Sequence, residues 1–253
     1  VLLINFSYFY TSLYIIKDEI RYNTTYNKKL SSEEKKMAVF RLNNEIVFPN
    51  PELSEEDGLL AIGGDLSVER LILAYCNGIF PWYNPGEEIL WWCPKPRFII
   101  YPSKIKISNS MKKILKKNQF KITFDNDFAA VISNCKEIRE CQEGTWITDH
   151  MKEAYIKLHN LGLASSVEVY EDEQLVGGLY GVKIGKCFFG ESMFSKVSNA
   201  SKAALISLAK KLEEEGFLFI DCQMHTNHLE SMGGEFVEWN KFKEMLKEGT
   251  KFN

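Results

Sequence analysis

Residues 165–184 read SSVEVYEDEQLVGGLYGVKI, and their pattern predicts a β-hairpin. Apolar and polar residues alternate on both sides of the polar segment 171–174, which is typical of two antiparallel strands that share a turn. On either side of this hairpin, apolar runs predict four more strands, at 97–101, 121–124, 186–190 and 217–222. Helical periodicity separates them at 108–117, 127–135, 148–161 and 200–215. The sequence therefore predicts an α+β fold, in which a mixed sheet with flanking helices covers residues 97–253.

The preceding part of the chain has a different composition. Residues 44–96 are dense in Pro, Gly and aromatic residues. One helix fits there, at 68–77, with Ser67 as its N-cap and Gly78 just beyond its end. We expect short strands and turns around this helix, and a small N-terminal domain over residues 37–96. Residues 1–36 are predicted to be an appendage, either disordered or an artefact of the assigned start, since Met37 can serve as an initiator.

Composition limits the classes of protein that fit. The apolar start, VLLINFSYFYTSLYII, lacks the basic region and cleavage site of a signal peptide and is shorter than a typical membrane span, so we expect no membrane segment. The net charge of −3 argues against a chain that is basic overall, so contact with nucleic acid needs a local basic patch. The six cysteines lack the paired short spacing of a zinc site, which favours reduced thiols in a cytoplasmic protein.

Aromatic residues cluster in FPWYNPGEEILWWCPKPR, residues 80–97. They can form a proline-framed aromatic core, or they can offer rings on which a nucleic-acid base stacks. Trp82 lies between Pro81 and Pro85 and is well suited to stacking.

A run of lysines without any acidic residue occupies residues 104–121. Met111, Ile114 and Leu115 make the buried stripe of the predicted helix, so the lysines lie on its exposed face. Such a face is either merely solvated or, in a net-acidic chain, the one stripe able to follow phosphates. The lysines are Lys104, Lys106, Lys112, Lys113, Lys116, Lys117 and Lys121.

Polar residues at two strand ends are the candidates for chemistry. Glu191 ends an apolar run, where a carboxylate is either paired structurally or placed to meet a cation. Asp221 and Gln223 are predicted to alternate at the end of a strand and so to point to the same face, where they can hold an amine. His225 and His228 form H-x-x-H, but no third ligand stands at a recognisable spacing, so we expect no metal.

Four segments, taken together and in this order, resemble the leucyl/phenylalanyl-tRNA–protein transferase family. They cover most of residues 46–234 and read DGLLAIGGDLSVERLILAYCNGIFPWYNPGEEILWWCPKPR, EGTWITDHMKEAYIKLHNLG, LVGGLYGVKIGKCFFGESMFSKVSNASKAAL and IDCQMHTNHLESMGG. The resemblance implies a C-terminal domain with the GNAT-type acyltransferase fold and a smaller N-terminal domain. It also implies an enzyme that moves Leu or Phe from tRNA to the amino terminus of proteins beginning with Arg or Lys, which marks them for N-degron proteolysis.

By matching position, the resemblance also implies residue roles. Trp82 would stack on the terminal adenosine of the aminoacyl-tRNA, and Trp146 would sit in the same donor site. Leu179 and Phe188 would help to form the pocket for the leucyl or phenylalanyl side chain, and such an apolar pocket also admits Met as a minor donor. Glu191, Asp221 and Gln223 would surround the reacting amine.

The chemistry of such a donor sets what the site must supply. An aminoacyl ester is already activated, so its aminolysis needs neither ATP nor a metal, and we expect no cofactor. An α-amine has a pKa around 7.7–8.0, so a hydrogen-bond acceptor suffices near neutral pH. Asp221 would orient and polarise Gln223, whose side-chain oxygen meets the amine. The alternative makes a carboxylate the direct proton acceptor.

Two other classes of function fit parts of the sequence. An N-acyltransferase that uses acetyl-CoA shares the expected fold, but the strand-to-helix passage SKVSNASKAAL, residues 195–205, has no glycine for the turn that holds a pyrophosphate. A non-catalytic RNA-binding module leaves Glu191, Asp221 and Gln223 unexplained. We therefore expect a monomeric cytoplasmic enzyme whose partners are leucyl-tRNA, phenylalanyl-tRNA and an acceptor protein.

Overall fold

The computed structural model describes residues 39–140 and 145–251. The predicted appendage at 1–36 lies outside the described residues. The chain divides into two compact units, of which the first comprises the described residues up to Trp82 together with Glu88–Cys93. The second comprises Tyr83–Glu87 and the described residues from Pro94 onward.

The described part of the first unit holds a small sheet, the 3-10 helix Pro51–Leu53 and the helix α2 (Val68–Cys76). Ser67 caps α2 as the sequence predicts. The ring of Trp91 is fully buried, and its Nε1 donates a hydrogen bond to the carbonyl of Gly63 at 2.9 Å. In spatial order the strands are β1 (Phe40–Leu42), β2 (Leu59–Gly63), β4 (Leu90–Trp92) and β3 (Phe80–Pro81). The short strands expected in this region therefore pair into one sheet.

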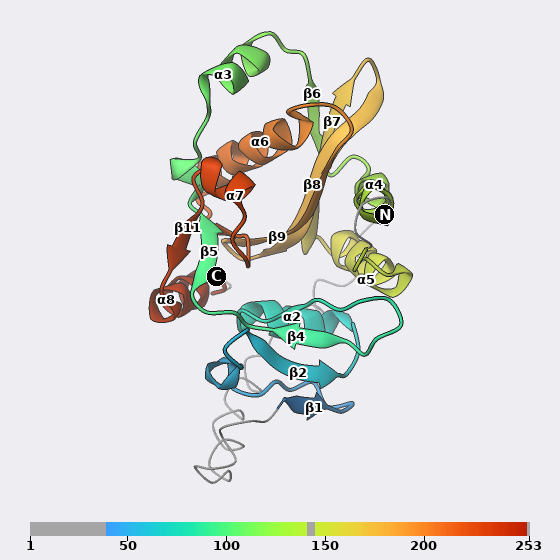
Figure 1. The fold of residues 1–253 in the computed structure, drawn as a ribbon, viewed down its shortest axis with the longest axis vertical. Coiled ribbons are helices and arrows are strands. Elements are labelled where there is room, and N and C mark those ends of the chain that lie inside the picture. The colour runs from blue at the N-terminus through green and yellow to red at the C-terminus, as the bar shows by residue number, and fades with distance from the viewer. Residues whose placement is uncertain (1–38, 141–144, 252–253) are drawn as a thin grey trace, which may run out of the picture. The chain divides into compact units, whose positions relative to one another are not determined.

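The second unit is built on a seven-stranded sheet, drawn in Figure 1. In spatial order its strands are β11 (Glu235–Val237), β5 (Arg97–Ile100), β10 (Phe219–Asp221), β9 (Cys187–Ser195), β8 (Gln174–Ile184), β7 (Ala164–Glu171) and β6 (Lys121–Phe124). Neighbouring strands are antiparallel except for β9 and β10, which are parallel. The predicted α+β character and mixed sheet are confirmed, and the predicted hairpin is the pair β7–β8.

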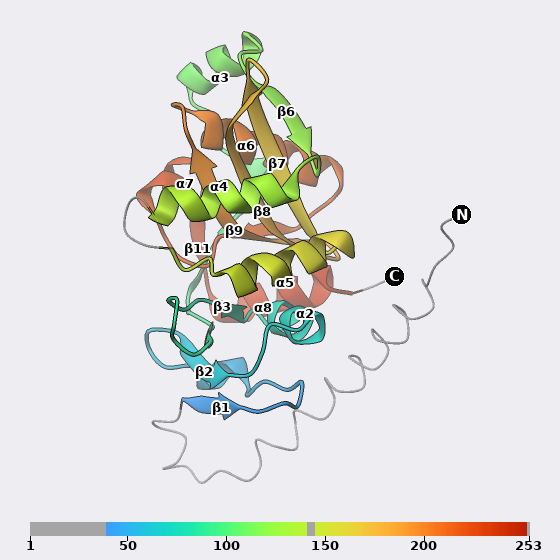
Figure 2. The same cartoon turned by 90° about the vertical axis from the view of Figure 1, so that its right-hand side faces the viewer.

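Helices cover both faces of this sheet. α6 (Ala200–Glu214) packs on one face, and α4 (Phe128–Glu140) and α5 (Asp149–Asn160) pack on the other, as Figures 1 and 2 show. Gly177 of β8 allows the close approach of α6, because a Cβ added there would lie 2.5 Å from the Cβ of Ala200. The other described helices of this unit are the 3-10 helix Pro102–Lys104, α3 (Asn109–Lys116), α7 (Asn227–Ser231) and α8 (Trp239–Gly249).

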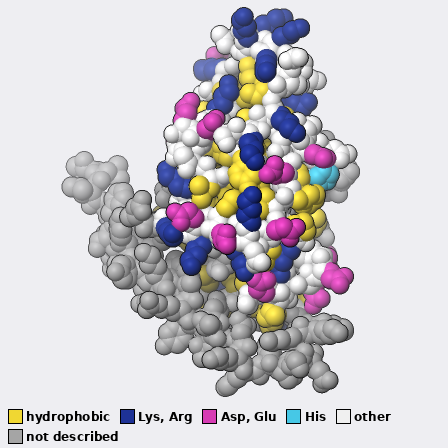
Figure 3. All heavy atoms as spheres, turned by 90° about the vertical axis from the view of Figure 1, so that its left-hand side faces the viewer, with side chains coloured by type: hydrophobic (Ala, Val, Ile, Leu, Met, Phe, Trp, Pro, Cys, Tyr) yellow, Lys and Arg dark blue, Asp and Glu magenta, His cyan; other side chains and the backbone are white. Residues whose placement is uncertain are grey.

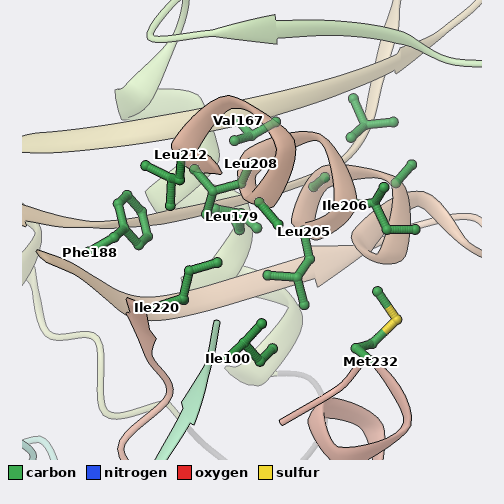
Figure 4. Close-up of a cluster of buried hydrophobic side chains, with 14 of the residues drawn as sticks. Ile100, Val167, Leu179, Phe188, Leu205, Ile206, Leu208, Leu212, Ile220 and Met232 are labelled. Carbon is green, nitrogen blue, oxygen red and sulfur yellow. The ribbon is translucent and has the colours of Figure 1, made fainter. Parts of the chain in front are cut away.

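A hydrophobic core fills the space between α6 and the sheet, as Figure 4 shows. Leu208 and Leu212 of α6 meet Leu179, Phe188 and Ile220 of the sheet there. Burying each such side chain contributes about 1.5–3 kcal/mol, which fixes α6 against the strands. Met111 of α3 joins the same core, with Ile114 and Leu115 partly buried against it, so the predicted apolar stripe of α3 is confirmed.

The chain runs from β9 through α6 to β10. Parallel neighbours need such a crossover, since a short turn cannot join them. β10 ends at Asp221, opposite Phe189, whereas β9 continues to Ser195. The far half of β9 therefore passes beyond the end of β10, and the crevice outside the carboxyl ends of parallel strands is the usual ligand site of such sheets.

Candidate active site

A β-bulge places Glu191. Gly181 of β8 pairs with Gly190 of β9, but Tyr180 pairs with Ser192, so Glu191 is the extra residue on β9. Bulges re-aim side chains and are common beside active sites. The predicted strand at 186–190 is too short for the same reason: the alternation breaks at Glu191, while the strand continues to Ser195.

Two tyrosines surround the carboxylate of Glu191. The hydroxyl of Tyr155, on α5, donates a hydrogen bond to its Oε2 at 2.9 Å. The rings of Tyr155 and Tyr180 meet edge to face with centroids 5.7 Å apart. Burial, and to a smaller extent the charge of Glu191, raises the pKa of Tyr180 well above its ordinary value, so this phenol keeps its proton. Glu191 is only partly buried, which leaves an oriented carboxylate within reach of a ligand.

Asp221 has a different environment from the one that the sequence predicts. It is fully buried and forms an ion pair with Arg97, which is 1% exposed. Nε of Arg97 donates to Oδ1 and Oδ2 of Asp221 at 3.0 and 3.1 Å. Burial raises the pKa of Asp221, and the positive charge of Arg97 opposes that rise. The Asp221 carboxylate is thus enclosed and paired with Arg97, and its predicted place near the reacting amine stays a prediction.

The predicted alternation of Asp221 and Gln223 on one strand is also wrong. β10 ends at Asp221, and Gln223 has a φ of +57°, in the left-handed region. That conformation costs a non-glycine residue on the order of 1–3 kcal/mol. The backbone N–H of Gln223 donates to Oδ1 of Asp221 at 2.9 Å, and this bond to a charged acceptor helps to hold the turn. Asp221 thus contacts the backbone of Gln223.

Glu191 and Gln223 follow the same end of the parallel pair β9–β10. Asp221 pairs with Phe189 across the parallel strands β10 and β9, so two residues further along each chain segment come Gln223 and Glu191. Both side chains are partly exposed. A carboxylate-bearing residue and an amide-bearing residue therefore follow the same end of the β9–β10 pair, and the ion pair of Asp221 and Arg97 contacts the backbone of Gln223 there.

Trp146 is connected to the same bulge. Its ring is partly exposed, and the guanidinium carbon of Arg139 lies 5.9 Å from the ring centroid. Nε of Arg139 donates to Oγ of Ser192, the residue after Glu191, at 3.1 Å. Arg139 therefore ties an aromatic ring to the strand that carries Glu191.

Trp82 lies in the first unit, where its side chain is 42% exposed. Nε1 of Trp92 donates to the carbonyl of Trp82 at 2.7 Å, and the two rings lie 5.6 Å apart at a tilt of 59°. This is a fixed backbone with an accessible ring, the arrangement that base stacking requires.

Leu179 and Phe188 both lie in the core beneath α6, and Figure 4 shows them with Leu208 and Leu212. Phe188 also lines a small pocket at the edge of that core, together with Leu208 and Leu212. Its lining also includes the polar residues Ser165, Lys183, Lys211 and Glu215.

All seven lysines between residues 104 and 121 are exposed. Lys104 lies 3.7 Å from the carboxylate of Glu235, and Lys121 lies 3.8 Å from that of Glu173. Among the described residues, the three lysines of α3 and its C-cap residue Lys117 have no such ion pair. Figure 3 shows dark-blue side chains gathered at the upper end of the face it views, where α3 lies, so the charge of this helix is available to a partner.

The remaining candidates do not form a metal site in the part of the chain that the structure describes. Nε2 of His225 lies 2.9 Å from Oε2 of Glu230, and its ring packs against Phe98 and Phe236. Within residues 39–140 and 145–251, no three His, Cys, Asp or Glu side chains gather as metal ligands would. Over the same residues, no helix has both the length and the apolar surface needed to cross a bilayer.

Sequence reasoning missed Arg97, Arg139 and Tyr155. Each lies far along the chain from its partner, by 124 residues for Arg97 and Asp221 and by 36 for Tyr155 and Glu191. Tyr155 lies on the buried side of α5, where a core residue has the same pattern. The one usable signal was Arg97, a charged residue at the start of the apolar strand RFII, which requires a buried partner.

Comparisons with known proteins cover both units. The family model described as "Leucyl/phenylalanyl-tRNA protein transferase" matches residues 99–247, and the model of its N-terminal domain matches residues 64–95. A leucyl/phenylalanyl-tRNA–protein transferase from Syntrophus aciditrophicus is 54% identical over 216 residues, which are 85% of this chain and 90% of the relative. The protein of the same name from Flavobacterium johnsoniae is 53% identical over 210 residues, 83% of this chain and 99% of the relative.

These matches define the class of protein as an enzyme, a transferase of aminoacyl groups. The chain belongs to the leucyl/phenylalanyl-tRNA protein transferase family. Among solved structures, an aminoglycoside acetyltransferase from a soil metagenome has a TM-score of 0.35 at 18% identity, covering 45% of this chain and 84% of that one. A likeness of that size does not define a fold, so the GNAT-type fold stays a prediction.

Proposed function

We propose that this chain transfers Leu or Phe, with Met as a minor donor, from aminoacyl-tRNA to the N-terminal α-amine of proteins that begin with Arg or Lys, creating an N-degron. The observation that carries the proposal is that Glu191 and Gln223 each follow, by two residues, the last paired residues of the parallel strands β9 and β10. Both side chains are partly exposed, and a carboxylate and an amide at that end of the strand pair suit a cationic amine. The second unit would act as a GNAT-type catalytic domain, in a cytoplasmic monomer.

The reaction is the aminolysis of an ester. The protonated acceptor amine first gives a proton to the solvent, which is accessible near neutral pH because its pKa is around 7.7–8.0. Its nitrogen then attacks the ester carbonyl, a C–N bond forms, and the bond from carbon to the ribose oxygen breaks. The second amine proton ends on that ribose oxygen as the tRNA leaves.

We assign a separate role to each residue of the site. The side-chain oxygen of Gln223 accepts a hydrogen bond from the amine and so directs its lone pair at the carbonyl. An amide is too weak a base to keep the proton, so Gln223 aligns the nucleophile. Glu191, oriented by Tyr155, supplies the negative charge that attracts a cationic acceptor. Asp221 acts indirectly, because it accepts a hydrogen bond from the backbone N–H of Gln223 and so fixes the position of that residue.

The donor is proposed to bind through apolar contacts and stacking. Leu179 and Phe188 are the residues proposed for the pocket of the leucyl or phenylalanyl side chain, and both are buried in the core beneath α6. Trp82, whose ring is exposed, is proposed to stack on the terminal adenosine, and Trp146 offers a second ring for the donor. The lysines of α3, with Lys104 and Lys106, would contact phosphates of the acceptor stem.

The start of α6 favours an aminoacyl ester over acetyl-CoA as the donor. A pyrophosphate needs free backbone N–H groups at a helix start. Here the N–H of Ser201 donates to Oγ of Ser195 at 3.2 Å, and the N–H of Ala200 donates to the carbonyl of Val197 at 3.3 Å. These amides already have partners within the chain, so the helix start is poorly suited to CoA.

A direct assay tests the proposal. The protein is mixed with leucyl-tRNA and a peptide that begins with Arg, and the added leucine is located by mass spectrometry. We expect transfer to the terminal amine, little transfer to a peptide that begins with Asp, and a strong loss with Gln223→Ala or Glu191→Gln. Acetyl-CoA in place of leucyl-tRNA should give no product. Transfer at the wild-type rate by both variants would contradict the assigned site.

A further inference from the structure

Arg97 occupies an unusual position for a basic side chain. It begins β5, the strand between β11 and β10 in the sheet, and it is almost completely buried. Its guanidinium carbon lies 4.9 Å from the ring centroid of Phe242 on α8, while Nε reaches both oxygens of Asp221. The cation is thus held between an aromatic face and a carboxylate, which fixes its position.

The same carboxylate also contacts a residue of the candidate site. Oδ1 of Asp221 accepts hydrogen bonds from Nε of Arg97 and from the backbone N–H of Gln223. Strand β5 holds the segment on its remaining side, because the N–H of Cys222 donates to the carbonyl of Phe98 at 3.0 Å, and the N–H of Phe98 donates to the carbonyl of Gln223 at 3.4 Å. Arg97 and Phe98 together therefore brace residues 221–223.

The left-handed turn depends on a charged Asp221. A carboxylate accepts a stronger hydrogen bond from a backbone N–H than a neutral carboxyl does. Burial disfavours the charged form, and Arg97 is the cation that opposes this effect. Without the guanidinium, the carboxyl would hold its proton more tightly, the bond to the N–H of Gln223 would weaken, and residue 223 would leave the left-handed conformation.

We propose that Arg97 is a positioning residue of this enzyme, which fixes the backbone of Gln223 through Asp221 and so directs the Gln223 side chain at the acceptor amine. This inference rests on the proposed function, because it requires that Gln223 meets the amine. Arg97 itself touches no substrate. A change at Arg97 should therefore lower the rate of transfer and leave the affinity for leucyl-tRNA unchanged.

A double-mutant cycle separates this role from a purely structural one. Arg97→Lys keeps a positive charge but removes the Nε–H that reaches both oxygens of Asp221, so the cation stabilises the Asp221 carboxylate less well. We expect it to lower the single-turnover transfer rate at saturating leucyl-tRNA by about 10- to 100-fold. The Kd of leucyl-tRNA should stay within about twofold. In a Gln223→Ala background, where the rate is already reduced, adding Arg97→Lys should cost no more than about twofold further.

Two more variants serve as controls. Asp221→Asn has the same size but no charge, and it should behave like Arg97→Lys, including the absence of a further loss beside Gln223→Ala. Arg70→Lys changes a second fully buried arginine, which contacts Asp65 and the carbonyl of Asn43 in the first unit. It should leave the transfer rate unchanged. Thermal unfolding of every variant reports whether the fold is kept.

The possible results are distinct. Wild-type rates for Arg97→Lys, or the same loss with and without Gln223→Ala, would overturn the positioning role while leaving the proposed function intact. Loss of the folded state in both Arg97→Lys and Asp221→Asn would also overturn it, since the pair would then be structural. A wild-type rate for Gln223→Ala alone would instead refute the role of Gln223 in the proposed function.

Discussion

The positive stripe of α3 gives a quantitative test of tRNA binding. Lys112, Lys113, Lys116 and Lys117 are exposed, and none of them forms an ion pair with a described residue. Replacing all four with Gln removes four charges while nearly keeping the helix propensity, because Lys and Gln are similar helix formers. If these lysines contact phosphates of the acceptor stem, the variant should bind leucyl-tRNA more weakly. The affinity of the variant should also fall less steeply with salt concentration than that of the wild type.

The magnitude follows from counterion release. Each phosphate contact contributes about 0.7–0.9 to the slope of log affinity against log salt concentration, so four contacts give a slope change of about 3. Raising the salt from about 50 to about 200 mM is a fourfold change, so wild-type affinity should fall roughly 60-fold more than that of the variant.

The assay is the Kd of leucyl-tRNA, measured by filter binding over that range. A matched control replaces four other exposed lysines with Gln, namely Lys157, Lys210, Lys241 and Lys247 on α5, α6 and α8. This control makes the same change in net charge and should keep most of the wild-type slope. Transfer from a short aminoacyl-adenosine analogue should be equal in all three proteins. Equal slopes for wild type and the α3 variant would refute the assignment.

Three further predictions concern packing, orientation and titration. Gly181→Ala should destabilise the fold by about 1–3 kcal/mol in a denaturant titration, since the new Cβ would lie 2.2 Å from the carbonyl of Phe189, whereas Gly190→Ala, whose nearest neighbour is 3.5 Å away, should be tolerated. A similar loss in both would point to something other than this contact. Tyr155→Phe removes the hydrogen bond to Glu191 and should slow single-turnover transfer about tenfold, while Tyr170→Phe on β7 should not; equal rates would show that Glu191 is oriented by other groups. Burial raises the pKa of Cys135 to about 12, so only about one in 10⁴ of these thiols is ionised at pH 8. Alkylation of Cys135 in the folded protein should therefore be very slow, and its rate should increase with pH. Unfolding exposes the thiol and should make its alkylation fast. Rapid labelling of Cys135 in the folded protein, located by mass spectrometry, would contradict that burial.

Much of the second unit could be predicted because its signals are local. Alternation of apolar and polar residues on both sides of a polar turn predicts the hairpin at 165–184. In the structure its two strands pair, with Val167 opposite Leu179. Helix α3 shows the same, since its apolar stripe separates cleanly from its lysines and Met111 is buried as expected. Periods of two and of 3.6 residues depend only on which face a segment buries.

The candidate site could be predicted only in part. Glu191 and Gln223 emerge from the sequence as polar residues at the ends of apolar runs, but alternation cannot reveal a bulge or a left-handed residue. The expected pairing of side chains on one strand end failed at that point, because β10 stops at Asp221 and the chain turns. A one-residue departure from the period changes which way a side chain points.

The sequence by itself determined most helices and strands, the family resemblance and the exposed charge of α3, because each of these depends on residues that are close together in the chain. Only the tertiary structure decided that Asp221 faces Arg97, that Tyr155 holds Glu191, and that Gln223 stands where β9 outruns β10. The physical reason is burial. A charged group enclosed in the protein must find a partner, and which of the many distant residues becomes that partner depends on strand order and register in the folded sheet.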